Sequence, residues 1–195
     1  MDKGAKILVF AGSAREGSFN KRLARVAAEA LRKAGAEATF ADLRDFPMPL
    51  FDQDFEAGLG AGEQPDAKRF KDLMRAHDGF LIASPENNSS YSALLKNVLD
   101  WASRRREGEK PHECYDGKPV AMVSASPGAL GGIRGLQTLR LLLGNLRMVV
   151  LPDMFALGDA AKAFDENGKL KDAKHVAAVE SVAAALVRLT AKMKS

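Results

Sequence analysis

Short apolar runs alternate along the chain with longer segments of helical period. Residues 7–11 form an uninterrupted apolar run, and apolar residues then recur every three or four positions over residues 23–34, ending before Gly35. An unbroken apolar run is typical of a strand buried on both faces, whereas the wider spacing is typical of an amphipathic helix. The two patterns return in turn to the end of the chain, which predicts alternating strands and helices.

The pattern predicts five strands and five helices. The strands are expected at residues 7–11, 38–41, 80–83, 120–123 and 148–151, the second of them near an edge, and the helices at residues 23–34, 66–76, 93–105, 133–146 and 176–190. Residues 42–65, with Pro47, Pro49 and several glycines, are predicted to form a long loop. Buried strands that alternate with crossover helices pack as a doubly wound, five-stranded parallel sheet with helices on both faces.

Composition favours one domain spanning residues 1–195, with enough hydrophobic residues (46%) for a sizeable core. The net charge is +4, but the basic residues have acidic neighbours and only 7% of residues are aromatic, which disfavours a nucleic-acid partner. The single cysteine, Cys114, excludes an intrachain disulfide and favours a reducing compartment. No apolar run approaches membrane-spanning length and no signal-peptide pattern opens the chain, so we expect a cytoplasmic protein without a membrane partner.

The loop after the first predicted strand has the composition of a phosphate site. It offers the hydroxyls of Ser13 and Ser18, the amide of Asn20, the guanidinium of Arg15 and the flexible backbone of Gly12 and Gly17. Because a helix follows, free N–H groups and the positive end of the helix dipole would face an anion. The alternative is a polar turn in which Ser18 or Asn20 only caps the helix.

Two common nucleotide motifs do not fit this loop. Gly12 and Gly17 have the spacing of a Walker A loop, but Ser18 and Phe19 stand where Lys and Ser or Thr would follow. Ala14 stands where the dinucleotide fingerprint has its second glycine. The leading candidate ligand is therefore a terminal monophosphate such as that of FMN.

Polar or small residues also follow the third and fourth predicted strands. The amides of Asn87 and Asn88 could hydrogen-bond the edge of a flat heterocycle, although a polar surface turn explains them equally well. In residues 124–132, small side chains would let the backbone approach a planar ligand, although Gly131 and Gly132 could simply prepare the next helix. Ligands of doubly wound sheets bind beyond the carboxyl ends of the strands, so we expect these loops to form one site.

With these segments in view, the chain resembles the NAD(P)H-dependent FMN reductase family of flavodoxin-like proteins. Residues 12–20 match its G-S-x-R-x-x-S-x-N loop, residues 85–88 and 95–101 match P-E-Y-N followed by L-K-N-x-x-D-W, and residues 117–134 match the fourth strand and its loop. Order and spacing agree over roughly residues 5–152. The chain departs from the family at Asn87, where Tyr is usual, and at residues 92–94, where Ser-Ala-Leu replaces Pro-Gly-Gly.

The resemblance implies a flavodoxin-like fold and a bound FMN. It implies that the FMN phosphate is held by Ser13, Arg15, Ser18, Phe19 and Asn20 with the intervening backbone, including that of Gly17. It places the ribityl chain and the ring against Pro85, Glu86, Asn87 and Asn88, and the pyrimidine end against Ser124, Ala125 and Ser126.

The implied activity is that of an oxidoreductase that takes a hydride from NADPH or NADH and reduces a small-molecule acceptor such as a quinone, with free flavin, azo compounds and chromate as further acceptors. The cofactor would carry the hydride chemistry, so no catalytic side chain or metal ligand is expected, and His77, His112 and His175 are predicted to lie at the surface. Two alternatives stay open: a flavodoxin-type electron carrier without substrate turnover, against which the basic charge argues, and a cofactor-free interaction module.

An assembly is also expected. Leu139 and residues 141–143 make the predicted helix at 133–146 apolar nearly all round, so another subunit or the C-terminal helix should cover its outer side. Members of the family commonly form dimers or tetramers, which implies a homodimer or homotetramer.

Overall fold

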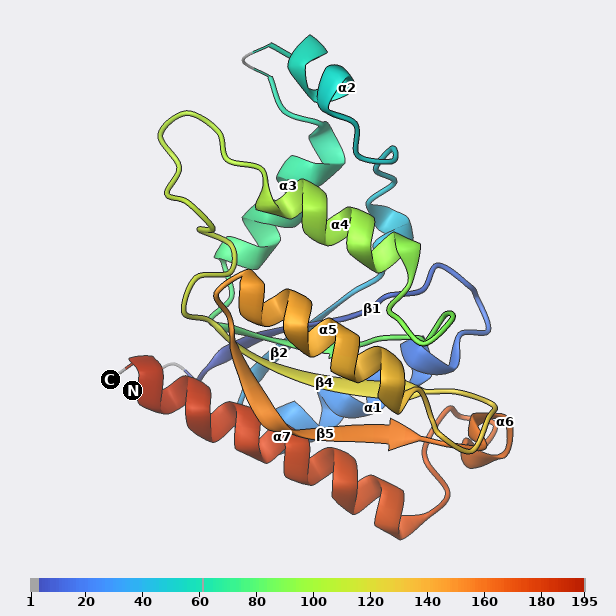
Figure 1. Ribbon diagram of the computed structural model, residues 1–195. Helices are drawn as coiled ribbons and strands as arrows, with labels where there is room; N and C mark the ends of the chain where they lie inside the picture. The colour runs from blue at the N-terminus through green and yellow to red at the C-terminus, as the bar shows by residue number, and fades with distance from the viewer. Residues whose placement is uncertain (1–3, 61, 195) are drawn as a thin grey trace.

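The centre of the protein is a sheet of five parallel strands in the order β2-β1-β3-β4-β5 (Figure 1). The computed structural model describes residues 4–60 and 62–194. Its strands are β1 (Lys6–Ala11), β2 (Glu37–Ala41), β3 (Gly79–Ala83), β4 (Pro119–Ala125) and β5 (Val149–Leu157). All neighbouring strands run parallel, and β2 lies at one edge. The predicted flavodoxin-like sheet is confirmed, including the edge position of its second strand.

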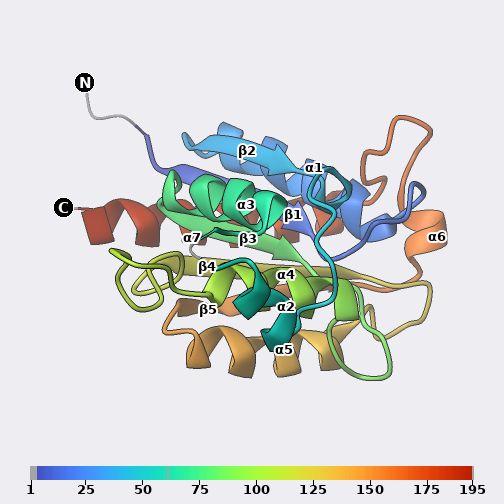
Figure 2. The same cartoon turned by 90° about the horizontal axis from the view of Figure 1, so that it is seen from above.

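Helices cover both faces of this sheet (Figure 2). On one face lie α1 (Phe19–Lys33) and α7 (Ala173–Lys194), and on the other lie α3 (Pro65–Arg75), α4 (Ala93–Ser103) and α5 (Ile133–Asn145). Alternate residues of β1 point to opposite faces of the sheet. Ile7 and Val9 pack toward α1 and α7, whereas Leu8 and Phe10 pack toward the other three helices. All four side chains are fully buried, which explains why the strand is apolar at every position.

The last strand is longer than the pattern predicted. It was expected to end at Leu151, but β5 continues to Leu157. The pairing with β4 shifts register between Val120 and Met122, opposite the segment that contains Pro152. Proline lacks an N–H for the ladder, so the bulge absorbs the break and the strand resumes beyond it.

Two short helices lie where the sequence predicted none. Residues 42–65 contain a 3₁₀ turn (Leu43–Asp45) and α2 (Gln53–Gly58), whose first turn is capped by Asp52 accepting a hydrogen bond of 2.8 Å from the Phe55 N–H. The single turn α6 (Ala160–Ala163) follows β5. Both helices are too short to show a helical hydrophobic period, so pattern alone predicted loops.

Histidine placement differs from expectation at one position. His77 is only 7% exposed, and its Nδ1 lies 2.7 Å from the Leu73 carbonyl oxygen at the end of α3, so the predicted surface location is wrong. His112 and His175 are partly exposed.

No helix in the described ranges is long and apolar enough to span a bilayer.

Candidate functional site

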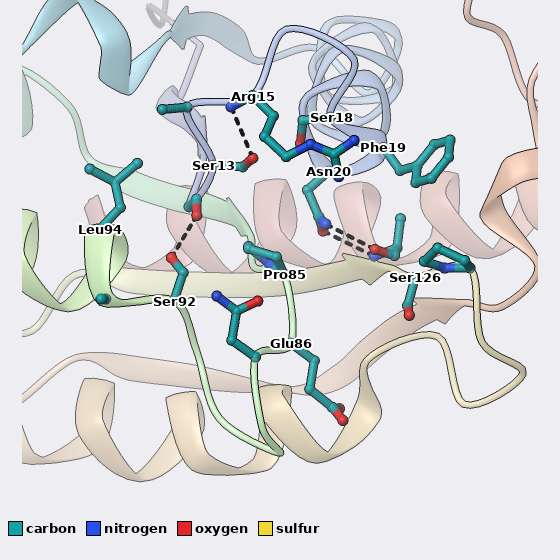
Figure 3. Close-up of a pocket in the computed structure, with 16 residues that line it drawn as sticks. Ser13, Arg15, Ser18, Phe19, Asn20, Pro85, Glu86, Ser92, Leu94 and Ser126 are labelled. Atoms are coloured by element: carbon teal, nitrogen blue, oxygen red, sulfur yellow. Dashed lines mark hydrogen bonds between the residues drawn. The ribbon is translucent and has the colours of Figure 1, made fainter.

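A cavity of about 400 Å³ opens at the carboxyl edge of the sheet, where the loops after β1, β3 and β4 meet (Figure 3). Its volume is within the range usual for small-molecule sites. Figure 3 shows Ser13, Arg15 and Ser18 gathered near the start of α1, facing Pro85 and Ser126 across the pocket. The three loops predicted to form one site therefore do meet. The lining residues are Gly12, Ser13, Ala14, Arg15, Ser18, Phe19, Asn20, Pro85, Glu86, Asn87, Ser92, Ala93, Leu94, Ala125, Ser126 and Pro127.

The start of α1 presents unpaired donors to this cavity. Ser18 is the N-cap residue, and its Oγ accepts a hydrogen bond of 3.3 Å from the Lys21 N–H. The N–H groups of Phe19 and Asn20 belong to the first turn and have no acceptor among the described residues. The exposed guanidinium of Arg15 likewise has no carboxylate partner within the part of the chain that the structure describes. Unpaired N–H groups, the helix dipole and a free cation together favour an anion here.

The side chain of Asn20 links this loop to β4. Its Nδ2 donates to the Ala125 carbonyl oxygen at 2.9 Å, and its Oδ1 accepts from the Ala125 N–H at 3.0 Å. Both ends of the amide are used, and Asn20 is only 4% exposed. Asn20 therefore offers a ligand only its backbone N–H, while its side chain holds the start of α1 against the end of β4.

Ser92 joins the first loop to the β3 loop. Its Oγ donates to the Gly12 carbonyl oxygen at 2.6 Å and accepts from the Leu95 N–H at 3.1 Å, which caps α4. A Cβ at Gly12 would lie 2.9 Å from the Leu95 Cβ, so only glycine allows this close packing. Ser92 was not among the residues predicted for the site, although a serine directly before an apolar helix is a usual N-cap signal.

Glu86 ties the β3 loop to the start of α5. Its carboxylate accepts hydrogen bonds from Arg134 Nη2 at 2.6 Å, Arg134 Nε at 2.9 Å and the Gly135 N–H at 3.0 Å. Burial opposes ionisation of Glu86, but these donors outweigh burial and hold the pKa of the carboxyl below its usual value. The carboxylate is thus committed to α5, and it positions this wall of the cavity.

The two neighbouring asparagines have different surroundings. Backbone hydrogen bonds in both directions between Asn87 and Ser90 close a tight turn, with positive φ at Asn88 (50°) and Ser89 (63°). Asparagine adopts this left-handed conformation more readily than most residues. Asn87 lines the cavity, but Asn88 does not.

Ser124 is also outside the cavity. It is fully buried, and its Oγ donates to the Gly131 carbonyl oxygen at 2.6 Å. Gly132 follows with φ of 93°, and a Cβ there would lie 1.9 Å from the Ser124 Oγ. Ser124 therefore shapes the loop that carries Ala125 and Ser126 to the cavity.

The structure brings most of the predicted site residues together. Those that line the cavity are Ser13, Arg15, Ser18, Phe19, Asn20, Pro85, Glu86, Asn87, Ala125 and Ser126, whereas Gly17, Asn88 and Ser124 lie outside its lining. Arg15 and Glu86 are the titratable side chains among the lining residues, and Glu86 is already paired. The cavity can thus hold an anionic, partly flat ligand and orient it.

Comparison with known proteins agrees with this geometry. Residues 5–162 match the model of the family described as NADPH-dependent FMN reductase. A quinone reductase of Pseudomonas putida is 35% identical over 175 residues, covering 88% of each chain, and an NAD(P)H-dependent FMN reductase of Pseudomonas aeruginosa is 36% identical over 176 residues, covering 89% of each. The solved structure of FerB, a flavoenzyme NAD(P)H:(acceptor) oxidoreductase from Paracoccus denitrificans, superimposes with a TM-score of 0.79 at 26% identity, covering 96% of this chain and 98% of FerB. This chain belongs to the NADPH-dependent FMN reductase family.

Proposed function

We propose that this protein is an FMN-dependent oxidoreductase that takes a hydride from NADPH or NADH and reduces small acceptors such as quinones. Family membership supports the reaction class. The observation that carries the proposal is the start of α1, where two unpaired N–H groups and Arg15 face a cavity at the carboxyl edge of the sheet. This edge is where doubly wound sheets bind nucleotide ligands.

The residues present fit FMN. In our proposal the phosphate is held by the backbone from Gly17 to Asn20, the hydroxyls of Ser13 and Ser18, and the guanidinium of Arg15. Phe19 borders the same end of the cavity. This set of phosphate-binding groups contains no lysine of the kind that binds the phosphates of a nucleoside triphosphate, which agrees with a monophosphate ligand.

The ring would lie between the β3 and β4 loops. Pro85, Glu86 and Asn87 form one wall and Ala125 with Ser126 the other, with the Asn87 amide and the Ser126 hydroxyl as side-chain hydrogen-bonding groups. When bound, FMN supplies the hydride chemistry, and the chain supplies binding, orientation and exclusion of water. Asn88 and Ser124 act indirectly in this proposal, by shaping the two loops.

Comparison of FMN with riboflavin tests the phosphate site. Riboflavin lacks the phosphate, so Arg15→Gln should weaken FMN binding about tenfold and leave riboflavin binding nearly unchanged. Fluorescence titration of the apoprotein measures both affinities. Arg188→Gln, which removes an exposed arginine on α7, is the matched control. Equal losses for FMN and riboflavin in Arg15→Gln would contradict the assignment of the phosphate to this loop.

Anaerobic mixing distinguishes an enzyme from an electron carrier. If the protein is an oxidoreductase, NADPH or NADH should bleach the yellow absorbance of the FMN-loaded protein, and a quinone should restore it. A flavodoxin-type carrier would stay oxidised with both donors. A protein that takes up no FMN at all would support the cofactor-free interaction module instead.

We also propose that the chain forms one FMN-binding domain that assembles as a homodimer or homotetramer in the cytoplasm. Leu141 on the outer side of α5 is 71% exposed and Leu50 before α2 is 80% exposed, and such apolar side chains favour contact with another copy. Sedimentation of the FMN-loaded protein tests this assembly, and a monomer at micromolar concentration would contradict it.

Cell fractionation tests the proposed cytoplasmic location, which the single cysteine supports.

A further inference from the structure

A second groove of about 310 Å³ runs along the outer side of α1, separate from the cavity at the carboxyl edge. One wall is α1, and the other is the turn at residues 166–169 between α6 and α7, which lies beside α1 (Figures 1 and 2). Three basic residues line the groove: Arg22, Arg25 and Lys169. Glu29 and Glu166 also line it, so the lining carries one excess positive charge.

Internal contacts fix the turn that forms the second wall. Asp165 Oδ1 accepts hydrogen bonds from the N–H groups of Asn167 at 2.9 Å and Lys169 at 2.8 Å, and Phe164 pairs with Leu170 across the turn. Phe164 in turn stacks on Phe19 of α1, with ring centroids 6.4 Å apart and planes 2° from parallel. This aromatic stack joins α1 to the segment that leads into the turn.

Both arginines are oriented by aromatic rings. The guanidinium carbon of Arg22 lies 5.9 Å from the centroid of Phe19, and that of Arg25 lies 4.9 Å from the centroid of Phe40 on β2. Stacking orients a planar guanidinium while leaving its N–H donors free at the edges. Among the described residues, neither arginine nor the Lys169 ammonium has a carboxylate partner, and neither guanidinium has an acceptor. Oriented, unpaired guanidinium groups suit a phosphomonoester, which they can bind bidentately.

The groove and the flavin cavity lie along the same helix, α1. Phe19 lines that cavity, and its ring lies under Arg22, which lines the groove, so one aromatic contact connects the two sites. At a rise of about 1.5 Å per residue, Arg22 and Arg25 follow Phe19 by about 4.5 and 9 Å along the helix axis. A dinucleotide whose nicotinamide reaches the cavity would have its adenosine half outside it, and Arg22 and Arg25 lie outside the cavity on the helix that begins there.

We propose that this groove binds the phosphate on the adenosine ribose of the hydride donor, so that the protein uses NADPH in preference to NADH. The inference rests on the proposed function, because it assigns the remote half of a donor whose reacting half enters the flavin cavity. Arg22 and Arg25 are the specificity-determining residues, and Lys169 adds to the positive charge of the opposite wall.

Binding of donor fragments tests the site without turnover. Calorimetry on the FMN-loaded protein, at fixed ionic strength, compares 2′,5′-ADP with 5′-AMP, which lacks the 2′-phosphate. We expect 2′,5′-ADP to bind at least about tenfold more tightly, and the double variant R22Q/R25Q to lose this difference. Glutamine keeps much of the side-chain stem over the rings while removing the charge. The charge-matched control K110Q/R188Q, at exposed positions outside the groove, should keep the difference.

Steady-state kinetics with a quinone acceptor give the second readout. In R22Q/R25Q the ratio of kcat/KM for NADPH to kcat/KM for NADH should fall about tenfold or more, mainly through a higher KM for NADPH, because the arginines bind a group remote from the reacting atoms. FMN affinity is measured in parallel, to separate loss of the donor site from damage to the flavin cavity.

Three outcomes would overturn the inference. The first is equal binding of 2′,5′-ADP and 5′-AMP, and the second is an unchanged donor ratio in R22Q/R25Q. The third is a groove that binds inorganic phosphate but from which NADPH does not displace 2′,5′-ADP. The groove would then be a simple anion site. Failure of the proposed function is distinct from these, because the FMN-loaded protein would then be reduced by neither donor.

Discussion

Two regions of the molecule gather charged and polar groups and use them in opposite ways. At the carboxyl edge of the sheet, Arg15 and the first N–H groups of α1 face open space without partners in the described part of the chain. At the corner formed by α2, α3 and α4, Lys71 is only 1% exposed, yet its Nζ contacts Glu63 at 2.6 Å, Glu109 at 2.8 Å and the Arg104 carbonyl oxygen at 2.9 Å. Arg104 in turn pairs with Glu56 of α2 at 2.8 Å.

The difference separates groups that hold the fold from groups available to a ligand. A buried cation without partners would cost several kcal/mol, so Lys71 requires the carboxylates of two loop segments and thereby fastens both segments to α3. Donors at the carboxyl edge remain in contact with solvent, so they can stay unpaired until an anion arrives. Variants at the corner should therefore change stability alone, whereas variants at the edge should change ligand binding as well.

The largest expected effect is the loss of the buried cation in Lys71→Met. Glu63 would lose its ion-pair partner, and Glu109 would keep Arg75 and the Arg106 N–H, so the free energy of unfolding should fall by about 3 kcal/mol or more, measured by urea denaturation. The FMN affinity of the folded protein should not change. Lys68→Met, which removes an exposed pair with Asp72, should leave the free energy of unfolding nearly unchanged. A comparable fall in FMN affinity for Lys71→Met would show that the corner is part of the site.

Asn20→Ala should affect both stability and binding. The buried N–H and carbonyl groups of Ala125 would lose their partners, at a cost of about 2 kcal/mol in unfolding free energy. Since the bridge sets the distance between the α1 loop and the β4 loop, FMN should also bind more weakly. Asn145→Ala, at an exposed position near the end of α5, is the control and should change neither quantity. Loss of stability with FMN affinity retained would mean that the bridge supports the fold alone.

The corner should also give the protein a characteristic acid sensitivity. Burial opposes ionisation of Glu109, but hydrogen bonds from Lys71, the Arg106 N–H and Arg75 outweigh it and lower its pKa from 4.5 to about 2. A carboxylate whose pKa is lower in the folded state stabilises the fold above pH 4.5, and this contribution is lost as the pH falls from about 4.5 to about 2. In Glu109→Gln the unfolding free energy should therefore fall less steeply over that interval.

Urea denaturation at a series of pH values measures this slope. Glu37→Gln, at an exposed position on β2, controls for the general effect of removing one carboxylate. Equal slopes for wild type and Glu109→Gln between pH 4.5 and about 2 would contradict a stabilising role for the ionised carboxylate.

The sequence predicted the sheet well where burial is symmetrical. β1, β3 and β4 are covered on both faces, so nearly every residue is apolar and the pattern is unmistakable. The pattern did not predict the full length of β5, because Pro152 interrupts the apolar run. It also missed α2, which is too short to show a helical period. The position of the site followed from topology alone, because the carboxyl ends of parallel strands meet at one edge.

The roles of individual site residues could not be predicted to the same depth. Asn20 bonds to Ala125, which lies 105 residues away in the chain, and Lys71 pairs with Glu109 at a separation of 38. No local pattern indicates such a distant partner. In the sequence, a polar residue that supports a loop therefore looks the same as one that contacts a ligand. The family resemblance assigned Asn20, Asn88 and Ser124 to the cofactor, although the side chains of Asn20 and Ser124 are held in internal hydrogen bonds and Asn88 lies outside the cavity lining.

The smallest expected effect tests this distinction at the two asparagines. Asn88→Ala should cost about 1 kcal/mol, because alanine adopts a φ near 50° less readily, and Asn88→Gly should recover that loss since glycine has no Cβ. Both variants should bind FMN as the wild type does. Asn87→Ala should do the reverse, weakening FMN binding while leaving the turn intact, because Asn87 lines the cavity and its contacts with Ser90 are made by backbone atoms. If both substitutions at Asn88 weakened FMN binding alike, its amide would have to reach the ligand, and the turn would have to rearrange when FMN binds.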